Sequence, residues 1–243
     1  MDDKYKFIDF LGLRFNVAND LSVLVSAVLV FILVFALSRK VTMRPGKAQN
    51  VLEWMIDFTN GIVKSAMPDG SGKQFNLYAF VLFLFIFVSN QLGLFFQLKI
   101  GGFTYVKSPT SNPLITMGLA TVSLLLSHYY AVKKFGFGGY LSNYARPVKF
   151  LLPINLLEEF TNFLTLSLRL YGNIFAGEVL LALIGTVAKS LGAVTFIGAM
   201  PLAMIWQGFS VFIGAIQAYV FTTLSMVYIS RKMEQEQHLL EDF

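Results

Sequence analysis

The chain of 243 residues contains no cysteine and little charge, because only 14% of its residues are Asp, Glu, Lys or Arg. The absence of cysteine excludes disulfides, thiolate metal sites and thiol catalysis. No P-loop, HExxH, GxSxG or GxGxxG motif occurs, nor any Cys and His spacing typical of a metal site. We therefore expect no covalent chemistry, no metal and no cofactor. The start of the chain, MDDKYKFIDF, also lacks the pattern of a signal peptide.

Hydrophobic residues dominate the chain instead. They make up 56% of the sequence, aromatic residues make up 15%, and the mean hydropathy is +0.64. These values lie outside the range of ordinary soluble domains and indicate an integral membrane protein. Because the loops between apolar tracts are too short to hold a soluble domain, we predict an all-α fold, a single polytopic membrane domain over residues 1–243.

Apolar tracts divide this domain into five predicted membrane-spanning helices. They cover residues 21–38, 76–98, 113–132, 150–188 and 191–230. Between the first two, Val51, Met55, Phe58 and Ile62 recur at helical spacing in a stretch that also carries charged residues. This pattern predicts an amphipathic helix at the membrane interface over residues 47–65.

The last two tracts are each about 40 residues long, whereas a helix needs only about 20 residues to cross about 30 Å of hydrocarbon. Each tract must therefore tilt, kink or double back, and the sequence does not decide between a hairpin and a tilted helix. Pro201, the interior helix breaker of the last tract, favours a kink or a helix start at that point.

The net charge of +5 is compatible with a nucleic-acid partner or an anionic lipid surface, but orientation in a membrane explains it better. Counting each tract as one crossing puts twelve Lys and Arg residues on one side and six on the other. The positive-inside rule then places the C-terminus in the cytoplasm and the N-terminus outside, and no nucleic-acid partner is expected.

Arg169 is the one Lys or Arg left inside the predicted spans, in the apolar stretch LTLSLRLYGNIFAGEVLLAL. An arginine at the centre of a membrane helix costs roughly 2.5 to 3.5 kcal/mol, so it normally faces a partner or a water-filled path. Successive steps of three or four residues place it on one helix face with a group of polar residues, namely Glu158, Asn162, Thr165 and Asn173.

Two further polar features accompany this stripe. Glu178 lies nine residues beyond Arg169, about 180° around the helix, and so points into a different environment. In the last tract a second stripe forms at steps of three or four residues, and we expect it to be able to face the first; it comprises Gln207, Ser210, Gly214 and Gln217.

Structural explanations compete with these functional ones. Arg169 could form an ion pair with Glu158 or Glu159, but its distance from either end of the tract argues against snorkelling. For Arg169 and Glu178 we favour a role in ion movement. Other polar residues of the spans are better explained as hydrogen-bonding contacts between helices, and they are Asn90, Gln91, Asn112, His128 and Gln207.

The segment SLRLYGNIFAGE, with PINLLEEF before it and GAIQAYVFTTLSMVYIS after it, resembles subunit a of the rotary F-type ATP synthase. The resemblance extends back through SPTSNPLITMGLA and VSNQLGLF to RPGKAQNVLEWMIDF and covers most of the chain. It implies a non-catalytic proton-conducting stator subunit whose last two helices are long and steeply tilted against a rotating ring of c subunits.

By this resemblance, protons reach a ring carboxylate through one half-channel and leave it through another. Arg169 attracts the deprotonated ring carboxylate and separates the two channels. The other candidate residues for proton translocation are Glu158, Glu159, Asn173, Glu178, Gln207, Ser210, Gln217 and Asn112. The implied partners are the c-ring, the peripheral stalk subunit b, protons and the lipid bilayer, and the implied location is a bacterial plasma membrane.

The sequence departs from the family pattern at three places. Asn112 stands where relatives often carry an acid, Ser210 where some carry a histidine, and Thr161-Asn162-Phe163 where many have Ser-Lys-Pro. Two other functions remain as alternatives: a free-standing ion-coupled transporter or channel that binds an anion at Arg169, and a structural membrane scaffold. The absence of an internal repeat weakens the transporter.

Overall fold

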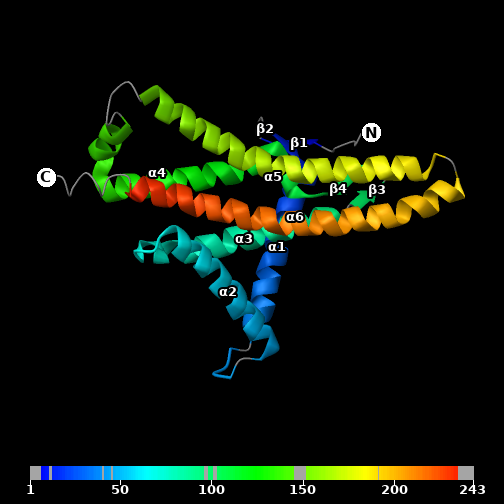
Figure 1. Ribbon diagram of the computed structural model, residues 1–243, viewed down its shortest axis with the longest axis horizontal. Helices are drawn as coiled ribbons and strands as arrows, with labels where there is room; N and C mark the ends of the chain where they lie inside the picture. Colours follow the sequence, from blue (N-terminus) through cyan, green and yellow to red (C-terminus); the bar gives the residue numbers. More distant parts are fainter. Residues whose placement is uncertain are drawn as a thin grey trace.

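The computed structural model of the protein describes residues 7–10, 13–39, 41–44, 46–95, 98–100, 103–144, 152–190 and 192–234. Six α-helices form most of this structure (Figure 1). They are α1 (Val17–Ser38), α2 (Lys47–Ala66), α3 (Asn76–Phe95), α4 (Pro113–Tyr144), α5 (Leu152–Ala188) and α6 (Ala193–Glu234). Short 3₁₀ turns, η1 (Ser71–Phe75) and η2 (Pro109–Ser111), precede α3 and α4.

Five of these segments are long and apolar enough to cross a membrane. They are Val17–Ser38, Ser71–Leu94, Pro113–Tyr140, Leu152–Ala188 and Val194–Met233. The remaining helix, α2, begins at Lys47 and ends at Ala66, where the sequence predicts an amphipathic helix. The predicted fold class, a polytopic helical membrane protein, is confirmed.

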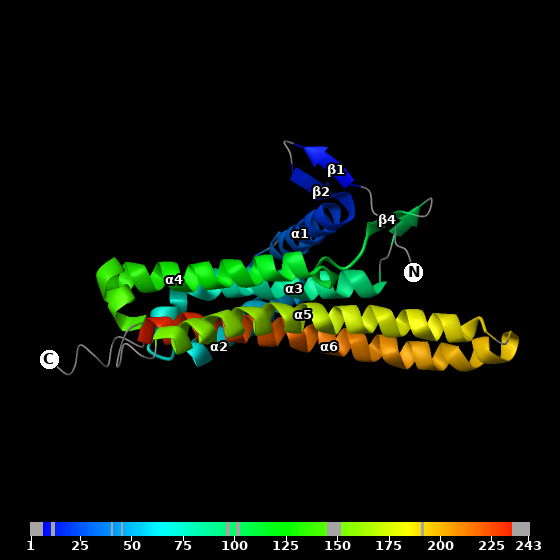
Figure 2. The same cartoon turned by 90° about the horizontal axis from the view of Figure 1, so that it is seen from above.

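The two longest tracts are single helices and not hairpins. Helix α5 has 37 residues and α6 has 42, which correspond to about 55 and 63 Å at 1.5 Å per residue. They run side by side over most of their length and cross the direction of α1 (Figures 1 and 2). Helix α6 continues through Pro201, so the helix start expected there is wrong.

Two short antiparallel hairpins, which the sequence analysis did not predict, accompany the helices. Strand β1 (Phe7–Phe10) pairs with β2 (Leu13–Asn16) immediately before α1, and β3 (Leu98–Ile100) pairs with β4 (Phe103–Val106) after α3. The predicted span 76–98 is therefore wrong at its end, because α3 ends at Phe95 and Leu98 lies in β3.

Helix α4 extends twelve residues beyond the predicted end of its span at residue 132 and bends on the way. At Gly136 the backbone has φ 76° and ψ 162°, and helical structure resumes after it. A positive φ is accessible to glycine at little cost and strained for other residues. The bend turns the last part of α4 back toward the bundle, as Figure 1 shows at the end near the C-terminus.

The interior contains two clusters of buried apolar side chains. One joins α3, α4, α5 and α6, and its members are Leu82, Ile86, Ala120, Leu166, Leu170, Ala218 and Phe221. The other joins α2, η1, α3 and α6, and its members are Ile62, Val63, Met67, Phe75, Ala79, Met226, Ile229 and Met233. Packing against both clusters fixes α6 along its C-terminal half.

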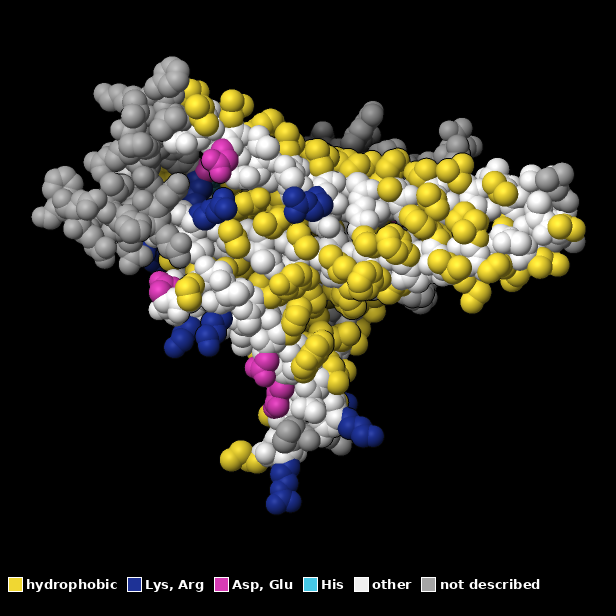
Figure 3. Space-filling view, in the orientation of Figure 1, with side chains coloured by type: hydrophobic (Ala, Val, Ile, Leu, Met, Phe, Trp, Pro, Cys, Tyr) yellow, Lys and Arg dark blue, Asp and Glu magenta, His cyan; other side chains and the backbone are white. Residues whose placement is uncertain are grey.

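The outer surface is mostly hydrophobic, as expected for a chain in lipid. Figure 3 shows apolar side chains covering much of the face over α5 and α6, and charged side chains gather toward one end of the bundle and toward the start of α2. A basic group also interrupts the apolar face over α5, which contains a single Lys or Arg, Arg169.

Candidate functional site

Arg169 projects from the middle of α5 onto the surface of the chain. Its side chain is exposed, and within the described residues it makes no hydrogen bond and no ion pair. Neighbouring residues on the outside of α5 are apolar and exposed as well, Leu168 by 45% and Phe175 by 47%. The proposed ion pair of Arg169 with Glu158 or Glu159 is therefore wrong.

The polar stripe around Arg169 lies at the outside of the bundle. Glu158 and Thr165 are exposed, whereas Asn162 and Asn173 are half-buried. The hydroxyl of Thr165 donates to the carbonyl oxygen of Thr161 at 2.7 Å, so it is satisfied within its own helix.

Glu159, the next residue after Glu158, points elsewhere and is held by two other helices. Its Oε1 forms an ion pair with Lys232 of α6, and its Oε2 lies 3.4 Å from Nε2 of His128 in α4. Neither partner could be predicted from the sequence, since both are far from Glu159 in the chain and no periodicity connects the three residues.

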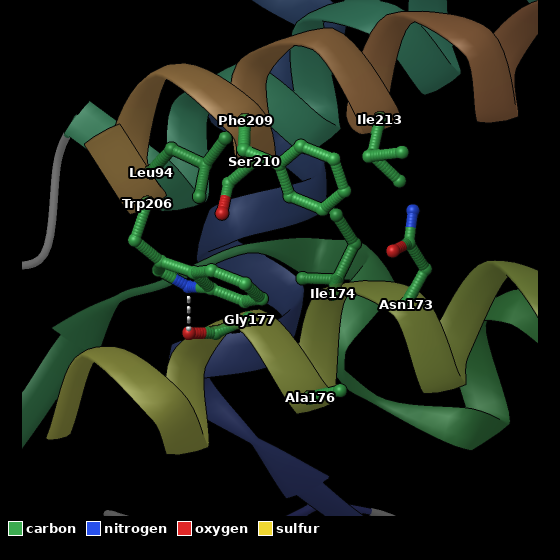
Figure 4. A pocket seen from close by; sticks show the side chains of 9 residues that line it. All are labelled: Leu94, Asn173, Ile174, Ala176, Gly177, Trp206, Phe209, Ser210 and Ile213. Atoms are coloured by element: carbon green, nitrogen blue, oxygen red, sulfur yellow. Dashed lines mark hydrogen bonds between the residues drawn. The ribbon is translucent and has the colours of Figure 1, made fainter. Parts of the chain in front are cut away.

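A small cavity lies between α5 and α6, on the side of Arg169 toward the end of α5. It measures about 70 Å³, room for about two water molecules, and is lined by Leu94, Asn173, Ile174, Ala176, Gly177, Trp206, Phe209, Ser210 and Ile213 (Figure 4). The indole Nε1 of Trp206 donates to the carbonyl oxygen of Gly177 at 3.3 Å. Within the described chain the buried Oγ of Ser210 has no hydrogen-bond partner.

Two other predicted residues lie close to this region. Glu178 directly follows Gly177, which lines the cavity, and its side chain is half-buried. Gln217 of α6 is 7% exposed, and its Nε2 has no hydrogen-bond partner among the residues described. The polar side chains of Asn173 and Ser210 thus supply hydrogen-bonding groups at the cavity between α5 and α6, and Gln217 supplies a buried one further along α6.

The second polar stripe faces two neighbours, so the expectation that it faces α5 holds only in part. Gln207 Nε2 donates to the carbonyl oxygen of Leu94 at 2.6 Å and therefore points toward α3. Gly214 also faces α3, because its carbonyl oxygen accepts a hydrogen bond from Asn90 Nδ2 at 2.9 Å. Ser210 is the member of the stripe that lines the cavity with α5.

Side-chain hydrogen bonds between helices hold α3 and α6 together, as the sequence analysis expects for Asn90, Gln91 and Gln207. In addition to the two contacts above, Gln91 Nε2 donates to the carbonyl oxygen of Val211 at 3.2 Å. The Oδ1 of Asn90 accepts from Thr110 Oγ1 at 2.7 Å, which links η2 to the same contact.

Asn112 lies at the start of α4 and caps that helix. Its Oδ1 accepts from the backbone N–H of Leu114 at 2.9 Å, and Pro113 occupies the first position of the helix. Both features are typical of helix N-termini. An aspartate could accept the same hydrogen bond, so the contact explains the capping role of Asn112 and not the choice of an amide over an acid.

The sequence also matches a known protein family over most of its length. A family model described as "ATP synthase A chain" matches residues 21–230. "ATP synthase subunit a" of Pediococcus pentosaceus is 55% identical over 228 residues, covering 93% of this chain and 96% of that protein. The proteins of the same description from Enterococcus faecalis and Bacillus subtilis are 48% and 47% identical, covering 98% and 97% of this chain and all of their own length.

Proposed function

Since the chain belongs to the ATP synthase A chain family, we propose that it is the membrane stator subunit that carries protons past a rotating ring of c subunits. The observation that carries this proposal is Arg169. A fixed positive charge lies exposed in the middle of an apolar helix, with no partner among the described residues of its own chain. Because such a charge is costly in lipid, its partner belongs to another subunit.

The chemistry of arginine suits this role. The guanidinium group of an arginine stays protonated in proteins, so it cannot itself pass a proton on, yet it attracts an opposing carboxylate. Each proton that crosses 100 mV delivers about 2.3 kcal/mol, and a direct leak past the ring would waste this energy. Arg169 therefore both draws a deprotonated ring carboxylate into place and blocks a shortcut between the two proton paths.

The two half-channels would lie on either side of Arg169 along α5. The cavity lined by Asn173 and Ser210, with Glu178 adjacent to it, supports a water-filled path toward one end. The exposed stripe that begins at Glu158 supports the other path. Gln217 and Gln207 would hydrogen-bond water or the neighbouring helix, and Asn112 would contribute by holding the start of α4.

The implied partners follow from the exposed surfaces. The apolar face of α5 and α6 would receive the c-ring, and the rest of the outer surface would contact lipid. Helix α2 presents Trp54, which is 68% exposed, and Val51, which is 50% exposed, as a contact for the peripheral stalk subunit b. The similar proteins come from bacteria, which supports a plasma membrane, with the N-terminus outside and the C-terminus in the cytoplasm.

ATP-driven acidification of inverted membrane vesicles tests this function. Arg169→Ala should abolish pumping in complexes assembled to the wild-type level, because the ring carboxylate loses its counter-charge. Thr121→Ala, an exposed position of α4, is a matched control that should pump normally. Pumping retained by Arg169→Ala, or ion transport by this chain reconstituted alone, would contradict the proposal.

A further inference from the structure

We propose that the adjacent acids Glu158 and Glu159 have different roles, although both precede Arg169 on the same helix. Glu159 is a positioning residue that fixes the first half of α5 against α4 and α6. Glu158 is the acid that exchanges protons on the exposed face leading to Arg169. This inference rests on the proposed function and assigns two residues within one of its half-channels.

The contacts of Glu159 show how it is held. Both of its carboxylate oxygens are engaged, one by the ammonium group of Lys232 and the other by the imidazole of His128 at 3.4 Å. The three side chains come from α4, α5 and α6, and each is 25% exposed or less. To exchange a proton, Glu159 would have to release one of these contacts, and this would weaken the packing of α5 against α4 and α6.

The contacts of His128 indicate which of its ring nitrogens carries the proton. Lys232 Nζ, which can only donate, lies 3.3 Å from His128 Nδ1, so Nδ1 accepts and Nε2 carries the proton of a neutral ring. Nε2–H then points at Glu159 as a donor. Lys232 thus contacts the carboxylate directly and also lies beside the imidazole ring that contacts it.

The bend in α4 supplies a fourth member of the cluster. After the left-handed turn at Gly136, the chain returns so that the hydroxyl of Tyr140 lies 2.7 Å from His128 Nδ1. Beside it, Lys134 Nζ donates to the carbonyl oxygen of Met233 at 3.0 Å. The contact of Lys134 connects α4 with α6, and the contact of Tyr140 holds the bent end of α4 against His128, which itself contacts Glu159.

Glu158 is placed differently. Its side chain is exposed and makes no ion pair or hydrogen bond with any described residue, although its charge acts on Lys232 and Tyr228 from a longer distance. Eleven residues separate it from Arg169, which corresponds to about 20° of rotation and about 16 Å along the helix. Both groups therefore lie on one face, with Asn162 and Thr165 between them. When Glu159 is held, Glu158 is directed outward.

The step assigned to Glu158 is a proton transfer through water. The O–H bond of a protonated ring carboxyl breaks near Arg169, a proton moves through water along the stripe, and an O–H bond forms on the Glu158 carboxylate. Glu158 then releases the proton to the aqueous phase beyond the end of the helix. No oxidant, reductant or other reactant takes part.

Variants that exchange the charges of Glu159 and Lys232 test the positioning role of Glu159 separately from the proton transfer assigned to Glu158. Glu159→Lys and Lys232→Glu should each reduce the amount of assembled complex, and the double variant should restore it, because the ion pair forms again in reverse. In membranes stripped of the ATP-hydrolysing sector, passive proton conductance per assembled complex should be normal for the double variant. Glu158→Gln should assemble normally and lower this conductance about tenfold or more, and Glu158→Asp should retain it.

Normal conductance in Glu158→Gln would overturn the inference, as would a fully assembled double variant with low conductance. Arg169→Ala, measured by ATP-driven pumping in membranes that retain the ATP-hydrolysing sector, distinguishes a failure of this inference from a failure of the proposed function. If Arg169 is required but Glu158→Gln conducts normally, only the division between the two acids fails. If Arg169→Ala pumps normally, the proposed function itself fails.

Discussion

Replacing Gly93 by alanine should displace the loop that holds α3 against α6. A Cβ at this position would lie 2.1 Å from Ser108 Cβ, 2.7 Å from its Cα and 2.9 Å from its backbone nitrogen. Since these include backbone atoms, no side-chain rotation relieves the clash. Ser108 Oγ lies 2.8 Å from Thr110 Oγ1, which donates to Asn90, so the displacement would also strain the contact between Asn90 and Gly214.

The cost can be worked from two contributions. Overpacking a filled interior costs typically 1–3 kcal/mol, and a hydrogen bond between membrane helices contributes about 0.6 kcal/mol. With the clash and two weakened hydrogen bonds, Gly93→Ala should lower the free energy of unfolding by about 2–4 kcal/mol. Loss of the Asn90 contact would also let α6 shift relative to α3 and lower proton pumping.

Thermal unfolding of the purified complex in detergent measures this effect. Gly118→Ala is the matched control, because Gly118 lies exposed on α4 with no atom within 4 Å of an added Cβ. Alanine should leave that helix unchanged or stabilise it by up to about 1 kcal/mol. A Gly93→Ala protein that unfolds within about 1 °C of the wild type would refute the reasoning from the close approach to Ser108.

Two further variants test the elements that shape the site. Gly136→Ala should destabilise the protein by about 1–2 kcal/mol in thermal unfolding, because its φ is positive, whereas the neighbouring exposed Gly138→Ala should not; equal melting temperatures would contradict the left-handed turn. Asn112→Ala should cost about 1 kcal/mol by removing the cap of α4, and Asn112→Ser should keep most of that stability; a normal melting temperature for Asn112→Ala would exclude the cap.

Composition and periodicity were enough to predict much of the fold. The helix over residues 47–65 differs from α2 by one residue, because charged and apolar residues alternate there with a clear helical period. Hydropathy did not predict where the helices end. Helix α4 continues past Lys133 and Lys134, where the apolar tract stops, because a helix requires backbone hydrogen bonds and not apolar side chains.

The long tracts show a second limit of the sequence. A hairpin of two short helices and one long helix share the same period of 3.6 residues, so the pattern alone could not distinguish them. Even Pro201 did not decide the question, since α6 continues through it. Membrane helices tolerate an interior proline because neighbouring groups satisfy the freed carbonyl.

For the site, helical phase grouped five polar residues of α5, of which Glu158, Thr165 and Arg169 are exposed, whereas Asn162 and Asn173 are half-buried. It could not indicate which of the two adjacent acids forms an ion pair within the chain. Glu159 is paired because Lys232 and His128 arrive from α6 and α4 through the tertiary fold. Contacts of this kind depend on how helices pack, which local sequence patterns do not encode.

The charges of α5 together argue that this chain does not work alone. Glu159 is neutralised within the chain, whereas Arg169 lies exposed on a polar stripe that is flanked by exposed apolar side chains such as Leu168 and Phe175. A transporter acting by itself would need to enclose Arg169 in its own interior or leave it against lipid at a cost of roughly 2.5 to 3.5 kcal/mol. Under the proposed function, a second subunit that brings a carboxylate to this face would remove the cost, and it would have to slide past the face for the charge to act repeatedly.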